Sequence, residues 1–319
     1  MNRLNFWPQL WRGLSTGFLV ALATGAIAQN EFSDCANCPA MIIVPAGTQH
    51  IGSAAHAAYR RSGERPEQKV VISSNFALGK FEVTVGQFRA FIESSGHSPQ
   101  PTLVNGRELK GCNYYDGATY GYVASHSWQS PGYAQREEDP VVCVSWSDAA
   151  AYAQWLSDQT GRSYRLPSST EFEYALRAGA RSPWFWGNNP DNACEYANVG
   201  DRSFRNRFPE RPQFDCQDRF VFTAPVGRFK PNQFGLHDML GNVWEWTQDC
   251  WHDDLTTAPL DGSAWLEESG GDCQSRVPKG GSWISGPGWA RAAARSKDGI
   301  HYRSFMLGFR VAATVNSSD

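Results

Sequence analysis

Residues 227–246 read GRFKPNQFGLHDMLGNVWEW, and they contain the segment Asp238–Glu245, on which the assignment of the fold depends. Its two carboxylates stand seven residues apart, on either side of Gly241. A turn at glycine can bring side-chain oxygens and freed backbone carbonyls to one point, and Ca²⁺ takes such oxygen ligands. The segment is therefore a candidate calcium-binding loop.

A second group of oxygen donors precedes this loop. Asn198 and Val199 are adjacent, and Asp218 and Phe220 follow Cys216 closely, so the two pairs could form another oxygen cage. Neither segment matches the twelve-residue helix–loop–helix calcium motif. On spacing alone a solvated polar loop is the simpler interpretation, and calcium needs support from elsewhere in the chain.

The composition predicts a folded, loop-rich chain. Of its 319 residues, 41% are hydrophobic and 13% aromatic, which suffices for a large core and excludes a disordered chain. Charged residues make up 19%, and 30 Gly with 18 Pro favour structured loops over helical bundles. The 29 basic and 32 acidic residues leave a net charge of -3, without a basic stripe, so we expect no nucleic-acid partner.

The N-terminus is typical of a secretory signal peptide. Arg3 and Arg12 lie in a region without acids, an apolar run follows from 14 to about 23, and Ala26 and Ala28 have the spacing of a cleavage site. A membrane anchor is the alternative, but the run is shorter than the roughly 18 residues that a span needs. We expect cleavage near Ala28 and export, to the periplasm, of a mature chain without a membrane span.

Eight cysteines, all in the expected mature chain, predict four disulfides in an oxidising compartment. Short loop closure favours Cys194 with Cys216 and Cys250 with Cys273. A redox or zinc motif at Cys35 and Cys38 is a weaker alternative, because no second CxxC or nearby histidine pair accompanies it.

Regular elements are few and short. β-branched residues predict strands at 41–44, 70–72, 76–78 and 81–83, with a last strand at 308–312. Capping residues and apolar spacing predict three helices. The first begins at Thr84 and ends at Gly96, the second follows 147–148 and ends at Gly161, and the third begins at Ser168 and ends at Gly179. We find no repeat or linker, which favours one α+β domain.

Common catalytic signatures are absent from the sequence. It contains no H-E-x-x-H, no P-loop and no dinucleotide fingerprint after a strand, and its G-x-S-x-G match at residues 13–17 lies in the predicted signal peptide and not in a strand-to-helix elbow. The seven histidines are scattered, and none stands three or four residues from another, so a helical histidine metal site is not expected.

Several independent motifs, in a fixed order, carry a family resemblance. They are Pro45–Gly47, Glu82–Thr84, Pro140–Ala149, Tyr164–Pro167, residues 227–246, Lys279–Trp283 and Leu307–Val311. Over about residues 39–313 the chain resembles the formylglycine-generating enzyme family, also called sulfatase-modifying factors. The resemblance implies an α+β, C-type-lectin-like fold with low regular secondary structure. We divide the chain into a signal peptide at 1–28, an N-terminal segment at 29–40, the family domain at 41–314 and a tail at 315–319.

The resemblance implies two structural calcium sites. One would take the side chains of Asn198 and Asp218 with the carbonyls of Val199 and Phe220. The other would take the side chains of Asp238 and Glu245 with the carbonyls of Gly241 and Val243. Each side-chain position holds an oxygen donor.

The catalytic centre of the family does not transfer in the same way. Its oxidases hold Cu(I) between two cysteines shortly after the Gly-Gly-Ser motif, and a soft metal needs such thiolates. Here these positions are Ser285 and Ala290. We therefore expect no copper site, and the resemblance alone leaves open whether the chain is an enzyme.

Three functions stay open. The first is an exported maturation enzyme for a peptide or peptide-derived substrate with other chemistry, as in relatives that finish pyoverdine siderophores in the periplasm. The second is a formylglycine-generating oxidase that converts a sulfatase cysteine. The third is a non-catalytic, lectin-like binding module for a polypeptide or glycan. Pocket candidates are Trp244, Ser282, Ser285 and Trp289, although burial in the core also explains the tryptophans, and no neighbouring histidine supports Ser282 as a nucleophile.

Overall fold

The computed structural model describes Met1 and residues 31–104, 107–205, 207–210, 213–266 and 270–315. Apart from Met1, the predicted signal peptide lies outside the described residues, as does the tail apart from residue 315. Within the described ranges, no helix combines the length and the apolar character that crossing a membrane requires.

Three helices follow the predicted capping signals. The first, α1 (Val85–Ser95), has the expected capping box at Thr84 and ends at Gly96 in the left-handed conformation. The second, α2 (Trp146–Thr160), begins earlier than predicted, because Ser145 is the N-cap and Asp148 closes its capping box.

The third helix, α3 (Ser169–Arg177), begins after Ser168 as predicted. It ends one residue before the predicted glycine, with Ala178 in the left-handed conformation. The remaining helical segments are short turns within loops: η1 (Ser62–Glu64), η2 (Pro190–Asn192), α4 (Ala193–Tyr196) and α5 (Arg202–Arg205).

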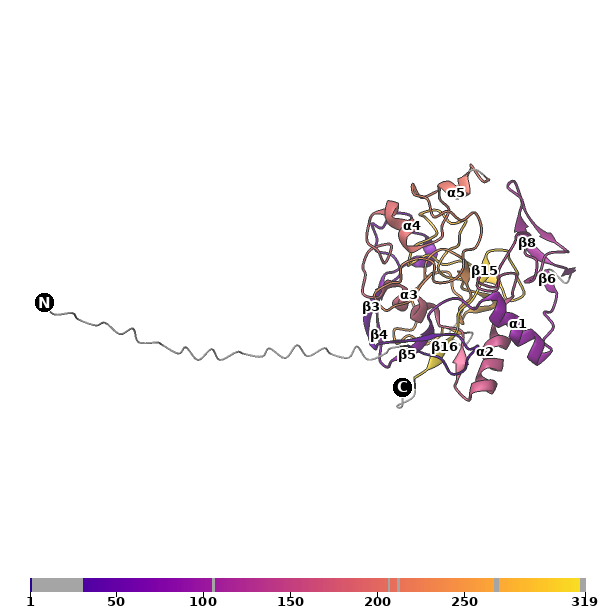
Figure 1. Cartoon of the computed structure of the whole chain (residues 1–319), viewed down its shortest axis with the longest axis horizontal. Helices are drawn as coiled ribbons and strands as arrows, with labels where there is room; N and C mark the ends of the chain where they lie inside the picture. Colours follow the sequence, from indigo (N-terminus) through magenta and orange to yellow (C-terminus); the bar gives the residue numbers. More distant parts are fainter. Residues whose placement is uncertain (2–30, 105–106, 206, 211–212, 267–269, 316–319) are drawn as a thin grey trace.

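The largest sheet joins both ends of the described chain (Figure 1). All of its pairs are antiparallel, and its C-terminal strand lies between strands from much earlier in the sequence. Its order is β1 (Glu31–Phe32), β2 (Met41–Val44), β5 (Phe76–Gly79), β16 (Ala312–Thr314) and β10 (Tyr164–Arg165).

Smaller sheets surround it. Three are hairpins: β3 (Gly47–Ile51) with β4 (Gln68–Ile72), β6 (Thr102–Val104) with β7 (Arg107–Leu109), and β8 (Cys112–Tyr115) with β9 (Tyr120–Val123). A three-stranded sheet contains β12 (Cys250–Trp251), β13 (Asp272–Arg276) and β14 (Asp298–Gly299). One short pair is parallel, β11 (Trp244–Glu245) with β15 (Leu307–Gly308).

Two strand predictions differ from the structure. Residues 81–83 form no strand. Val83 donates its N–H to the Phe309 carbonyl and accepts from the Val141 N–H, so its backbone bonds to two different segments instead of pairing along one strand. The strand expected at 308–312 is divided into β15 and β16. Between them the Arg310 side chain points into the interior and binds Glu245, so residues 308–312 do not pair along a single strand.

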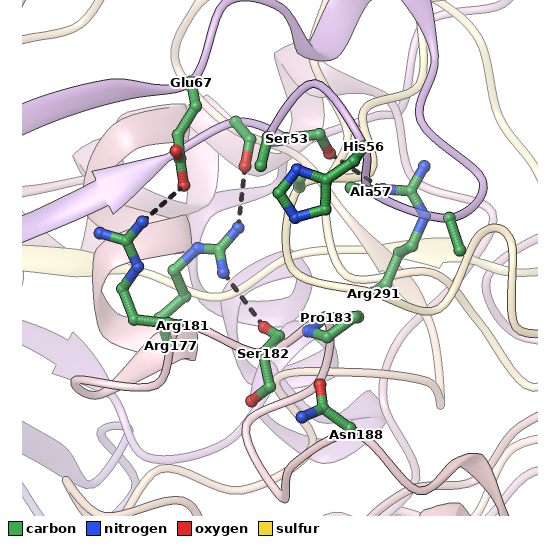
Figure 2. A pocket seen from close by; sticks show the side chains of 14 residues that line it. Ser53, His56, Ala57, Glu67, Arg177, Arg181, Ser182, Pro183, Asn188 and Arg291 are labelled. Atoms are coloured by element: carbon green, nitrogen blue, oxygen red, sulfur yellow. Dashed lines mark hydrogen bonds and ion pairs between the residues drawn. The ribbon is translucent and has the colours of Figure 1, made fainter.

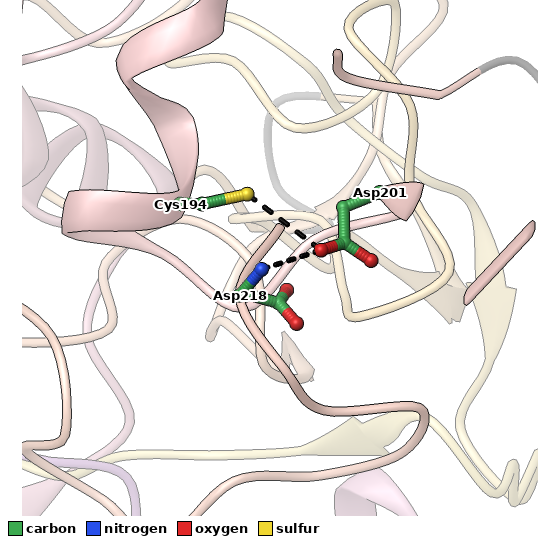
Figure 3. A group of neighbouring side chains, drawn as sticks. All are labelled: Cys194, Asp201 and Asp218. Atoms are coloured by element: carbon green, nitrogen blue, oxygen red, sulfur yellow. Dashed lines mark hydrogen bonds between the residues drawn. The ribbon is translucent and has the colours of Figure 1, made fainter. Parts of the chain in front are cut away.

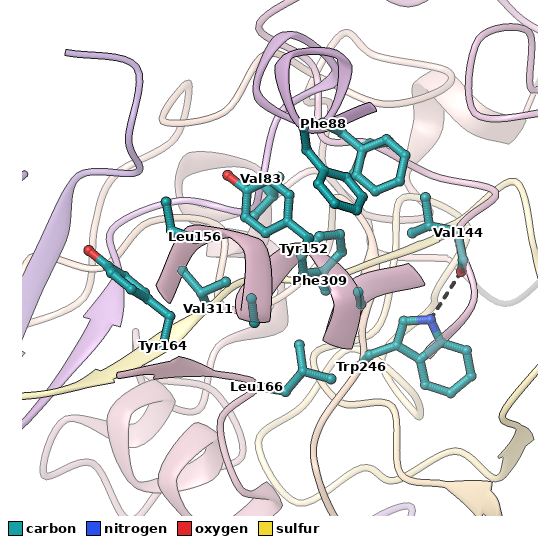
Figure 4. Close-up of a cluster of buried hydrophobic side chains, with 14 of the residues drawn as sticks. Val83, Phe88, Val144, Tyr152, Leu156, Tyr164, Leu166, Trp246, Phe309 and Val311 are labelled. Atoms are coloured by element: carbon teal, nitrogen blue, oxygen red, sulfur yellow. Dashed lines mark hydrogen bonds between the residues drawn. The ribbon is translucent and has the colours of Figure 1, made fainter. Parts of the chain in front are cut away.

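The main apolar cluster lies where α1 and α2 pack on the C-terminal segment (Figure 4). Tyr152 of α2 meets Phe309 edge to face, with ring centroids 5.3 Å apart. Trp246 is fully buried and donates from its indole N–H to the Val144 carbonyl at 3.1 Å. The cluster therefore fixes the C-terminal end of the loop at residues 238–246, where Trp244 and Trp246 belong to it.

All eight cysteines form disulfides. The two predicted pairs, Cys194–Cys216 and Cys250–Cys273, are confirmed. The other bridges are Cys35–Cys38 and Cys112–Cys143. Every thiol of the chain is therefore engaged in a covalent bond.

The close approach at Gly308 generates a stability prediction. A Cβ at this position would lie 2.3 Å from the Val141 carbonyl oxygen. We expect Gly308→Ala to lower the free energy of unfolding by about 1–3 kcal/mol, as overpacking does. Gly121→Ala is the control, since a Cβ there has no atom within 4 Å. Urea unfolding would compare them, and equal stabilities would contradict this packing.

Candidate functional site

Three sequence motifs meet at the centre of the molecule. β11 runs parallel to β15, and Glu245 exchanges two backbone hydrogen bonds of 2.9 Å with Lys279. Asp238, Gly241 and Asn242 have positive φ angles, which gives the loop before β11 its sharp turns. The turn at Gly241 is also tight in space, because a Cβ there would lie 2.1 Å from the Asn198 carbonyl oxygen.

A buried ion pair lies beneath this meeting point. Arg310 binds both carboxylate oxygens of Glu245, at 2.6 and 2.8 Å, and neither side chain is exposed to solvent. The same guanidinium donates to the Gly79 carbonyl at 3.0 Å and to the His237 carbonyl at 3.1 Å. One side chain thus joins three parts of the chain, namely the segment at Gly79, the motif at 227–246 and the segment of Arg310 itself.

Two further carboxylates lie close to this pair, and three of their four oxygens have no hydrogen-bond partner among the described residues. Neither oxygen of Glu82 has a hydrogen-bond partner among the described residues, and the same holds for Oδ1 of Asp238. Asp238 Oδ2 accepts from the Gly227 N–H at 2.6 Å. Both side chains are about 1% exposed, and a buried carboxylate is costly unless a partner or a cation satisfies it.

The electrostatics agree with this shortage of positive charge. Burial, with the neighbouring Asp238 and Glu245, raises the pKa of Glu82 well above its usual range. Burial likewise raises the pKa of Asp238 to about 6. Arg310 faces all three carboxylates, so the oxygen atoms left unpaired fit a divalent cation. Glu82 escaped the sequence prediction, although a charged residue between Phe81 and Val83 is itself a signal.

The second predicted site also contains unpaired buried oxygen. Asn198 is fully buried, and its Oδ1 has no partner in the described ranges. Its amide nitrogen donates to the Phe222 carbonyl at 2.8 Å and to Asn242 Oδ1 at 3.1 Å. Asn242 lies in the loop of the first site, so the two loops are joined by this amide pair.

The acidic group at this second site includes a residue that the sequence prediction missed (Figure 3). Oxygens of Asp201 and Asp218 and the sulfur of Cys194 lie within 4.8 Å of one another. The sulfur belongs to a disulfide, so the carboxylates are the ligands available there. Burial, together with Asp201, raises the pKa of Asp218 to about 8.

Backbone groups already engage these carboxylates. Asp218 accepts from the N–H groups of Val199 at 3.0 Å and Phe220 at 2.7 Å. The two residues predicted to offer carbonyl ligands thus lie beside Asp218, and their N–H groups face it. Asp201 accepts from the N–H groups of Phe204 at 3.0 Å and Asp218 at 2.5 Å.

The four pocket candidates differ in exposure. Ser282 is fully buried, Ser285 is 4% exposed and Trp244 is 8% exposed, whereas Trp289 is 38% exposed. Ser285 Oγ accepts from the Ser282 N–H at 3.0 Å, so this hydroxyl stabilises the local turn. Trp244 and Trp289 meet edge to face with ring centroids 5.9 Å apart. Of the four, only Trp289 is therefore exposed to solvent.

The residues at the family's copper positions do not fit Cu(I). Ser285 is hydrogen-bonded within its turn, and Ala290 is fully buried, with its carbonyl accepting from the Trp184 indole at 2.6 Å. A hydroxyl and a methyl group offer no thiolate, and the eight cysteines are all bridged.

Comparison with known proteins places these features in a family. Residues 28–315 match the model of the sulfatase-modifying factor enzyme 1-like domain. The chain is 31% identical to the formylglycine-generating enzyme of Mus musculus over 303 residues, which covers 86% of this chain and 74% of that protein. It is 29% identical to the inactive C-alpha-formylglycine-generating enzyme 2 of Mus musculus, over 87% of this chain and 86% of that protein.

A solved structure gives the same answer for the fold. PvdO from Pseudomonas aeruginosa is 33% identical and superposes with a TM-score of 0.72, covering 89% of this chain and 98% of that one. The predicted α+β architecture with little regular structure is thereby confirmed as that of the formylglycine-generating enzymes. With a family match over nearly its whole described length and with the motif segments gathered around one buried centre, the chain belongs to the sulfatase-modifying factor family.

Proposed function

We propose that this chain is an exported, calcium-stabilised member of the family that binds and matures a peptidic partner without copper-cysteine chemistry. One combined observation carries the proposal. Ser285 and Ala290 stand at the copper positions, and every cysteine of the chain is part of a disulfide. We assign a peptidic partner because the chain is similar to formylglycine-generating enzymes, whose substrates are polypeptides. Whatever the chemistry is, it uses groups other than thiolates of this chain.

The proposed location and domain division rest on the sequence and the disulfides. Four bridges form and persist in oxidising compartments. They support export to the periplasm, whereas cleavage near Ala28 and a family domain at 41–314 rest on the sequence.

A non-catalytic binding module is the second candidate. The likeness to an inactive relative, at 29% identity, favours it. In this alternative the scaffold presents Trp289 to a partner and performs no turnover.

Calcium is proposed as a structural ion at both sites. One ion would be held by Asn198 and Asp218, with Asp201 as a further oxygen donor. The other would be held by Asp238 and Glu245 near Glu82. At each site the ion would supply positive charge to buried oxygens and no redox chemistry, because its ligands are hard oxygens.

Chelation tests the calcium proposal. Binding to the folded state alone stabilises by RT ln(1 + [L]/Kd), so calcium at a hundred times Kd adds about 2.7 kcal/mol per site. We expect chelation to lower the melting temperature, and Asp238→Ala to lower it in calcium but little further in chelator. Asp158→Ala is the control for charge, because this carboxylate is exposed on α2. The absence of any shift at millimolar calcium would remove both sites.

The raised carboxyl pKa values predict how the calcium effect depends on pH. An acid whose folded pKa lies above its unfolded value stabilises the fold at low pH, and that stability is lost as pH rises toward the folded pKa. For Asp238 and Asp218 the folded values are about 6 and about 8. In chelator, the melting temperature should therefore fall between about pH 5 and pH 8, while calcium should suppress the fall. If calcium raised the melting temperature by the same amount at about pH 5 and at about pH 8, this explanation would be contradicted.

The copper assignment has a direct assay. The purified mature chain is incubated with a sulfatase-type cysteine peptide, with and without Cu(I), and the peptide is analysed by mass spectrometry. We expect the cysteine to stay unconverted, because no thiolate pair exists to hold the metal. An active formylglycine-generating enzyme in parallel shows that the peptide is competent. Copper-dependent formation of formylglycine by this chain would overturn the proposal.

A further inference from the structure

A basic cavity of about 300 Å³ is lined in part by Arg291, two residues after the exposed Trp289 (Figure 2). The loop after β3, the C-terminal end of α3 and the segment after Trp289 form its walls. Three guanidinium groups line it together with one carboxylate. Its volume is at the lower end of small-molecule sites, which suits a side chain rather than a whole metabolite. The charged and polar lining residues are Ser53, His56, Glu67, Arg177, Arg181, Ser182, Asn188 and Arg291.

Two of the guanidinium groups are fixed. Arg177 is 6% exposed, binds Glu173 at 2.8 and 3.0 Å, and donates to the Gly52 carbonyl at 3.0 Å. Arg291 is 2% exposed, binds Glu64 with both terminal nitrogens, and donates to Ser53 Oγ at 3.3 Å. Neither side chain needs to move or lose its partner when a ligand arrives.

The carboxylates behind the wall do not cancel this charge. Glu173 also accepts from Lys279 at 2.8 Å, and Lys279 is fully buried. The buried group of Arg177, Arg291 and Lys279 therefore faces Glu64 and Glu173, with one positive charge in excess. In a water-poor environment such an excess acts over a longer range than it would at the surface.

The third guanidinium is the most exposed of the three, and besides Glu67 it contacts His50 Nδ1. The Arg181 side chain is 57% exposed, and its pair with Glu67 is 3.2 Å long, with Glu67 itself 29% exposed. Exposed pairs of this kind contribute little stability. An incoming carboxylate can replace Glu67 at small cost and form the charge-assisted hydrogen bonds that guanidinium favours.

An aromatic surface adjoins the cavity. Tyr59 is 58% exposed and Trp289 is 38% exposed, and the Arg61 guanidinium lies 3.4 Å from the centre of the Trp289 ring. Tyr59 has a φ of 62°, a strained conformation for an aromatic residue. The Arg291 guanidinium holds it there by donating to the Tyr59 carbonyl at 2.7 Å. One residue therefore organises both the cavity and the aromatic surface.

We propose that this cavity and the Tyr59–Trp289 surface together bind an acidic peptide, with an apolar side chain on the rings and a neighbouring carboxylate at Arg181. The proposal rests on the proposed function, since it specifies the charge of the peptidic partner. Charge complementarity selects the carboxylate, and the exposed rings select an apolar neighbour.

Two matched peptides test the proposal by isothermal titration at low salt. The probes are N-acetyl-Ala-Phe-Glu-Ala-amide and the same peptide with Gln in place of Glu, which differ by one negative charge. We expect the acidic probe to bind at least tenfold more tightly. Arg181→Ala should remove this preference, and Arg181→Lys should retain part of it. Trp289→Ala should weaken both probes by a similar factor and leave the ratio unchanged.

Arg89→Ala is the matched control. Arg89 lies on α1, on the opposite side of the molecule from β3 and β4 in Figure 1, and its pair with Glu137 is also exposed. It should keep the full preference. Equal binding of the two probes, a preference that survives Arg181→Ala, or no binding of either probe at millimolar concentration would each overturn the inference. The calcium and copper assays use neither probe, so failure here is distinguishable from failure of the proposed function.

Discussion

The buried pair of Glu245 and Arg310 is the interaction on which the centre of the molecule depends. Each residue belongs to a different sequence motif, and the guanidinium also binds the carbonyl of His237, in the motif of Glu245, and the carbonyl of Gly79, in a third segment. Removal of one partner from a buried pair typically costs about 3–5 kcal/mol, because the other charge is left without compensation. The pair therefore explains why a chain with so little regular structure has one defined arrangement of loops.

The sequence correctly predicted the starts of two helices and the short-loop disulfides, because these features depend on residues that are close together in the chain. Thr84 and Ser168 accept hydrogen bonds from N–H groups of their own helices, and Cys194 and Cys216 close a short loop. Residues near each of them in the sequence were therefore enough to predict the helix starts and the disulfide. Glu82, although part of a quoted motif, and Asp201 were missed as site residues because their neighbours in the site lie far along the chain. The strand expected at 81–83 failed for the same reason, since Val83 bonds to two distant segments.

The family's chemistry and its scaffold have separate physical requirements. Soft copper needs two thiolates near the Gly-Gly-Ser motif, whereas the scaffold needs buried oxygens and the central ion pair. Here Ser285 and Ala290 occupy the positions of the two thiolates and leave the buried oxygens and the central ion pair in place. The framework around the exposed Trp289 therefore does not depend on thiolates at these two positions.

The position of β16 constrains when the chain can fold. Ala312–Thr314 lies between β5 and β10, so the largest sheet has a gap until the last residues of the described chain are available. A chain emerging from its N-terminus, whether from a ribosome or through a translocation pore, would hold the earlier strands unpaired along that edge. Contacts between such distant segments form late because loop closure comes first. Completion of the sheet therefore follows synthesis of residues 312–314, and a truncation that ends before residue 312 separates β10 from the rest of the sheet.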